Sequence, residues 1–67
     1  MIKIVTVNNK KWAQFEHTKQ NKAVTKNMVL MYGGSRYLYN GTIIYRMCGV
    51  YGNLEQAYQE LFDRASQ

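Results

Sequence analysis

The clearest pattern of apolar and polar positions lies in the last fifteen or so residues of the chain. There the apolar side chains recur at the three- and four-residue spacing of a helix and fall within one arc of about 140°. They are Leu54, Ala57, Tyr58, Leu61, Phe62 and Ala65. Asn53 precedes them as a good N-cap, with Gln56 three residues later at the spacing of a capping box. The pattern predicts an amphipathic helix that packs its apolar face on the rest of the protein.

A β-hairpin is predicted around Asn40-Gly41, because this dipeptide supplies the two positive-φ residues of a type I′ turn. Tyr39 then lies opposite Thr42, and the pairing continues outward until Ser35 reaches Arg46. Paired residues share a face of the sheet. One face carries Leu38, Ile43, Tyr45 and Met47. The other face carries Ser35, Tyr37, Tyr39, Thr42, Ile44 and Arg46.

A second hairpin is predicted at the N-terminus, with strands from Ile2 to Val7 and from Lys10 to Glu16. Its turn is Asn8-Asn9, and Asn tolerates left-handed backbone conformations better than most residues. In this register one face groups Ile2, Ile4, Ala13 and Phe15, and the other groups Val5, Val7 and Trp12. Both faces of this hairpin therefore need to be partly covered by other parts of the protein.

The segment between the two hairpins has no clear period. Residues 17–27 are polar and contain three lysines without an acid, and we interpret them as a solvated loop. The apolar run 28–32 fits a buried strand, which would make a three-stranded meander with the second hairpin. It equally fits the end of a helix that starts near Lys19 and stops at Gly33. The sequence leaves these two alternatives open.

Together these elements predict an α+β fold: a small antiparallel sheet of two hairpins, with four to five strands and one C-terminal amphipathic helix packed on it. A length of 67 residues allows one small domain, residues 1–67. A core of this size rarely supplies more than roughly 3–5 kcal/mol of net stability without a staple. The single cysteine, Cys48, cannot form an internal disulfide, so self-association is an open alternative.

The side chains that carry most enzyme chemistry are sparse. His17 and Cys48 are the only strong nitrogen and sulfur ligands, and a structural zinc site needs about four. No orienting third residue accompanies them as a nucleophile and base pair, and the acids of the C-terminal helix lie on its polar side. Gly33-Gly34-Ser35 lacks the spacing and the lysine of a phosphate-binding loop. We therefore expect no enzymatic activity, no metal and no cofactor.

Charge is unevenly distributed along the chain. The formal net charge is +5, with +7 over residues 1–50 and −2 over residues 51–67. A basic body with an acidic terminal helix suits a surface for phosphates or for an acidic protein.

Aromatic residues alternate with the basic residues, as in proteins that bind single strands by stacking bases on rings while cations follow the backbone. The alternative is that these rings simply pack in the core. The candidate nucleic-acid-binding residues are Lys10, Lys11, Trp12, Lys19, Lys22, Lys26, Tyr37, Tyr39 and Arg46. We expect a small basic protein that binds RNA or single-stranded DNA rather than duplex.

A competing hypothesis is a modulator that binds and inhibits or redirects a host protein, including as an adaptor between RNA and protein. The many Lys, Asn, Ile and Tyr residues indicate an A+T-rich gene, as in a bacteriophage or a low-G+C bacterium. The N-terminal apolar run is broken by Lys3 and Thr6 and is too short to span a membrane. With a lone thiol as well, we expect a cytoplasmic protein without membrane contact.

Overall fold

The computed structural model describes residues 2–47 and 54–65. Its strands and helices follow the chain in the order β1 (Lys3–Val7), β2 (Lys10–Glu16), α1 (Lys19–Tyr32), β3 (Ser35–Tyr39), β4 (Thr42–Arg46) and α2 (Leu54–Ala65). The strands form one antiparallel sheet in the order β1-β2-β4-β3. The predicted α+β fold is confirmed, with four strands. The predicted N-cap Asn53 lies outside the described residues.

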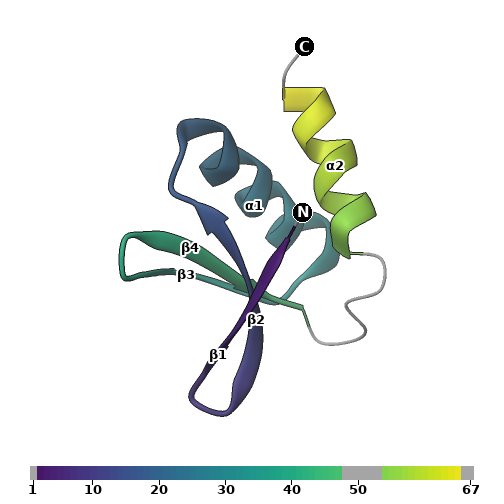
Figure 1. Ribbon diagram of the computed structural model, residues 1–67. Coiled ribbons are helices and arrows are strands. Elements are labelled where there is room, and N and C mark those ends of the chain that lie inside the picture. The colour runs from purple at the N-terminus through teal and green to yellow at the C-terminus, as the bar shows by residue number, and fades with distance from the viewer. Residues whose placement is uncertain (1, 48–53, 66–67) are drawn as a thin grey trace.

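Both hairpins have the predicted register. In the first, Asn8 and Asn9 occupy the turn with φ of 53° and 65°, and Ile4 lies opposite Ala13. In the second, Asn40 and Gly41 have φ of 48° and 77°, and the pairing runs from Tyr39 and Thr42 to Ser35 and Arg46. The two hairpins join through β2 and β4 and splay apart beyond this junction (Figure 1). The turn residues alone were therefore enough to fix the pairing within each hairpin.

The interpretation of residues 17–27 as a loop is wrong, because they form most of α1. Thr18 caps the helix by accepting a 3.0 Å hydrogen bond from the backbone N–H of Asn21. Gly33, with φ of 76°, ends it, and its N–H donates to the carbonyl of Val29 at 2.9 Å. Of the two alternatives left open for residues 28–32, the helix is therefore the one observed. No helix among the described residues is long and apolar enough to cross a bilayer.

The buried face of α1 is partly polar, which explains why its period was hidden in the sequence. Its buried residues are Asn21, Val24, Thr25 and Met28. The hydroxyl of Thr25 donates to the carbonyl of Asn21 at 2.7 Å and accepts from Nε of Arg36 on β3 at 2.7 Å. Because these polar atoms find partners inside the fold, they can face the sheet without a large desolvation penalty.

The core lies between one face of the sheet and the two helices. Its buried residues are Ala13, Phe15, Val24, Met28, Ile43, Tyr45, Leu54 and Leu61. Helix α2 packs along α1 and reaches the sheet where Tyr58 lies against Phe15, with ring centroids 4.9 Å apart. Since all four core residues of the sheet belong to one face, the described helices cover that face alone. We call the opposite side the open face; it carries Lys10, Trp12, Tyr37, Tyr39, Ile44 and Arg46.

Candidate nucleic-acid interface

Trp12 and Tyr37 meet on the open face, although they lie on strands separated by β4. Their ring centroids are 5.6 Å apart, with the rings in an edge-to-face arrangement at 69°. Trp12 is only 8% exposed, and its indole N–H donates to the carbonyl of Val7 at 3.3 Å. Ile44 on β4 is also buried on this face. Trp12 and Ile44 therefore form a fixed apolar floor, and Trp12 offers little ring surface to a ligand.

Tyr37 and Tyr39 are different, because both remain accessible at the edge strand. Tyr37 is 58% exposed and Tyr39 is 39% exposed. The alternative that the rings pack inside the protein therefore holds for Trp12 and is wrong for the two tyrosines. Being two residues apart on β3, they share the open face and are separated by roughly 6.5 Å along the strand.

These side chains border a groove of about 430 Å³ on the open face. The residues that line it are Val7, Asn8, Lys10, Trp12, Tyr37, Leu38, Tyr39 and Ile44. Lys10 is exposed at the start of β2 and brings a positive charge to a groove whose other lining side chains are uncharged. Arg46, opposite Ser35, is half-buried on the same face but does not line the groove.

The other predicted site residues lie elsewhere. Lys11 follows the strand alternation and is on the sheet face shared by Ala13 and Phe15. Lys19, Lys22 and Lys26 are exposed along one stripe of α1, directed away from its buried face. The nine candidates therefore fall into an open-face group of five and a group on the helical side of the molecule.

Four groove residues were absent from the predicted site: Val7, Asn8, Leu38 and Ile44. Ile44 could have been found from the hairpin register, since it lies directly opposite Tyr37. The others depend on how the two hairpins are joined, which places Val7 and Asn8 of one hairpin and Leu38 of the other around the same groove. No local sequence signal carries this information.

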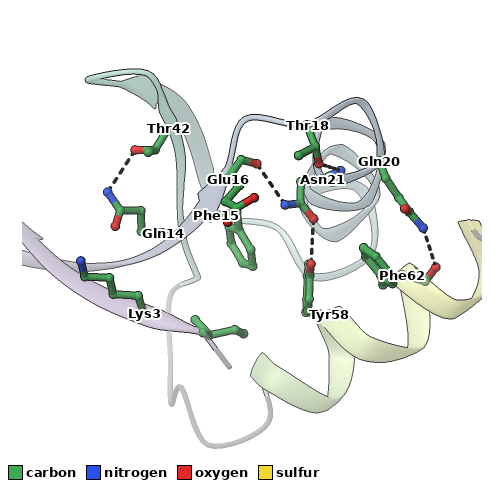
Figure 2. Close-up of a pocket in the computed structure, with 11 residues that line it drawn as sticks. Lys3, Gln14, Phe15, Glu16, Thr18, Gln20, Asn21, Thr42, Tyr58 and Phe62 are labelled. Carbon is green, nitrogen blue, oxygen red and sulfur yellow. Dashed lines mark hydrogen bonds between the residues drawn. The ribbon is translucent and has the colours of Figure 1, made fainter.

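A second hollow of about 560 Å³ lies where β1 and β2 meet the start of α1 and the middle of α2 (Figure 2). Several of its polar side chains are hydrogen-bonded to one another or to backbone carbonyls. The Tyr58 hydroxyl donates to Oδ1 of Asn21 at 2.7 Å, and Nδ2 of Asn21 donates to the carbonyl of Glu16 at 3.0 Å. Nε2 of Gln20 donates to the carbonyl of Phe62 at 3.3 Å. This hollow is therefore where hydrogen bonds connect the two helices to β2.

Burial, and to a smaller extent the nearby charge of Glu16, raises the pKa of Tyr58 above its usual value. A phenol of ordinary pKa near 10 is already protonated at neutral pH, and the raised pKa keeps the Tyr58 hydroxyl a donor to Asn21 further into the alkaline range. Among residues 2–47 and 54–65, no group of three His, Cys, Asp or Glu side chains is placed to hold a metal ion.

Neither protein-family models, nor curated proteins, nor solved structures gave a match to this chain.

Proposed function

We propose that this protein is a non-catalytic, cytoplasmic binding protein that holds a single strand of RNA or DNA against the open face of its sheet. The observation that carries the proposal is the pair of accessible rings, Tyr37 and Tyr39, beside a groove with a buried Trp12 floor and a single lysine, Lys10. Large aromatic rings on an uncovered sheet face are costly to leave in water, and bases are the flat apolar partners that they accommodate.

The spacing of the two tyrosines favours a single strand over a duplex. Stacked bases of one duplex strand rise about 3.4 Å per nucleotide, whereas Tyr37 and Tyr39 are separated by roughly twice that distance. Two neighbouring bases that each stack on a tyrosine must therefore be separated from each other. An unpaired strand can open in this way at little cost, and a paired strand cannot.

Charge favours a nucleic acid on this face, although it does not discriminate between a single strand and a duplex. By the strand register the open face carries Lys3, Lys10 and Arg46 with one acid, Glu16, and the chain as a whole has a net charge of +5. The acids of α2 are on a helix that packs against the covered side of the sheet, away from the groove. A phosphate backbone that follows the groove thus meets the charge of Lys10 and no carboxylate, because neither Glu16 nor α2 lines the groove.

The proposal is tested by titrating the full chain with labelled single-stranded RNA, single-stranded DNA and a matched duplex at low salt. We expect both single strands to bind more tightly than the duplex. Equal affinity for the duplex would indicate charge attraction alone, and no binding to any of the three would contradict the proposal.

A second candidate function, binding to a host protein as a modulator, is favoured by a different surface. Leu30 and Met31 near the end of α1 are both exposed, on the helix that also carries the stripe of three lysines. Exposed apolar side chains beside cations are typical of a surface for an acidic protein partner. Changing Leu30 and Met31 to Ser separates the two candidates, because it should leave binding to a single strand unchanged.

A further inference from the structure

The edge strand β3 offers unpaired backbone groups along its outer side. It is the last strand in the order β1-β2-β4-β3, and no other described strand pairs with it beyond β4. Its last three residues, Tyr37, Leu38 and Tyr39, are all exposed, with Leu38 at 61%. Long, apolar and uncovered edges are rare in natural sheets because they attract another strand.

The hairpin geometry identifies which backbone groups face outward. In a two-residue turn the carbonyl of Tyr39 faces the N–H of Thr42, so the backbone groups of Tyr39 are directed to β4. Along an antiparallel strand, residues whose backbone groups face the partner strand alternate with residues whose backbone groups face the other way. Arg36 and Leu38 therefore direct their backbone N–H and C=O groups to the free edge. These groups are a template for one more antiparallel strand.

The opposite edge of the sheet is partly protected. By the same alternation, the even-numbered residues at the β1 edge direct their backbone N–H and C=O groups outward. One of these groups, the N–H of Ile2, donates to Oε1 of Glu55 on α2 at 3.1 Å. Lys3 also places a charge on this strand, which is a common device against edge pairing. The outer side of β3 has neither device: its only charged residue, Arg36, binds Thr25 on the helical side.

We infer that β3 is a dimerisation edge, which pairs antiparallel with β3 of a second copy about a two-fold axis through Tyr37. In this register Ser35 to Tyr39 overlap completely. Arg36 lies opposite Leu38 of the second copy, and Leu38 opposite its Arg36. The outward groups of these residues form two hydrogen-bonded pairs, and every residue stays on its own face of the joined sheet.

The side chains make this edge complementary to itself. Tyr37 lies opposite Tyr37 of the second copy at a position without hydrogen bonds, where opposing side chains are closest and aromatic pairs are favourable. Each arginine faces a leucine, so the register opposes no like charges although each copy carries a net charge of +5. A strand without an aromatic residue opposite Tyr37 would gain the backbone hydrogen bonds but would lose this aromatic pair.

The dimer would join the two open faces into one eight-stranded surface, with the tyrosines of both copies at its centre. This inference concerns the edge alone and does not depend on nucleic acid being the ligand of the open face. Its test therefore uses the protein without any ligand.

Sedimentation equilibrium of the full chain over a range of concentrations up to about 1 mM measures the association. We expect a monomer–dimer equilibrium, and a Leu38→Lys change to raise the dissociation constant at least about tenfold, because the new lysine faces Arg36 of the second copy. Leu38 is exposed, so the melting temperature should stay the same when it is measured at a concentration at which both proteins are monomeric. Ile4→Lys is the matched control: Ile4 is 46% exposed on β1, and its change should leave association intact. A monomer at every concentration, or equal weakening by both changes, overturns the inference.

Disulfide trapping tests the register independently of those variants. In a Cys48→Ser background, Tyr37→Cys should form a covalent dimer on mild oxidation, since facing residues without hydrogen bonds have Cα atoms about 4.5 Å apart. Leu38→Cys should not, because the two residues 38 lie on a diagonal at roughly 7–8 Å. Trapping that is equal at both positions, or absent at residue 37, contradicts this register.

Discussion

The hydroxyl of Tyr58 on α2 donates a 2.7 Å hydrogen bond to the side-chain amide oxygen of Asn21 on α1, a residue that is itself buried. Asn21 in turn donates to the carbonyl of Glu16 at the end of β2. One short chain of polar contacts thus connects both helices and the sheet within a core of few apolar residues. Each member of this chain is needed, because an unsatisfied polar group inside a protein is expensive.

Removing the donor should therefore destabilise the fold. Tyr58→Phe leaves Oδ1 of Asn21 without its 2.7 Å partner and should lower the free energy of unfolding by about 1–3 kcal/mol. Urea denaturation followed by circular dichroism measures this. The matched control is Tyr39→Phe on the open face, which should change stability little. Equal stability of Tyr58→Phe and the unmodified protein would mean that the hydrogen bond does not contribute.

The raised pKa of Tyr58 predicts a pH dependence at the alkaline end. Because the folded protein favours the neutral phenol, the stabilisation from Tyr58 is complete below the ordinary tyrosine pKa near 10 and is lost as pH rises through the higher folded pKa. Unfolding of the Tyr58→Phe variant should thus depend less steeply on pH above about 10 than that of the unmodified protein. Parallel curves for the two proteins over that range would rule out this coupling.

Truncating a side chain on the buried side of α2 should destabilise the fold, whereas truncating one on the exposed side should have little effect. Leu61 is buried in the core, and Leu61→Ala should cost roughly 2–5 kcal/mol, enough to unfold a domain of this size. Glu60 is exposed, so Glu60→Ala should shift the melting temperature little. Comparable shifts for the two changes would show that a different side of the helix is buried.

Salt should reveal which lysines meet the phosphates. On a single strand each neutralised phosphate contributes a slope of roughly −0.7 to the dependence of log K on log salt concentration. Lys10→Ala should make the measured slope shallower by about that amount if the strand follows the groove. Changing Lys19, Lys22 and Lys26 to Ala together should affect the slope less, because these residues lie on the helical side. The reverse order would move the binding surface to α1.

The hairpins were predictable because their information is local: Asn8-Asn9 and Asn40-Gly41 each specify a turn, and the strand alternation then assigns the faces. Helix α1 was not predictable in the same way, because Asn21 and Thr25 occupy its buried face and interrupt the apolar period that marks a helix. Their partners, Tyr58 and Arg36, are distant in sequence, so nothing near them indicates that they are buried.

In the candidate site, too, some features follow from the local sequence and others depend on contacts between distant parts of the chain. The register placed Tyr37, Tyr39 and Arg46 on one face, whereas the contact between Trp12 and Tyr37 depends on how the two hairpins are joined. The exposure of each ring also depends on how the two hairpins are joined. Exposure distinguishes the buried Trp12 at the floor of the groove from Tyr37 and Tyr39, which a ligand can reach.

Tyr37 and Tyr39 are proposed to hold a single strand on the open face, and a titration with a labelled strand measures their contribution. A fluorescently labelled strand of about 10 nucleotides is titrated with the unmodified protein and with the Tyr37→Ala, Tyr39→Ala double variant, after circular dichroism has shown that the variant is folded. Each ring should contribute about 1–3 kcal/mol, so the double variant should bind at least about thirtyfold more weakly. Its melting temperature should fall only by the loss of the contact between Tyr37 and Trp12. Affinity equal to that of the unmodified protein in a folded double variant would show that the two rings do not hold the strand.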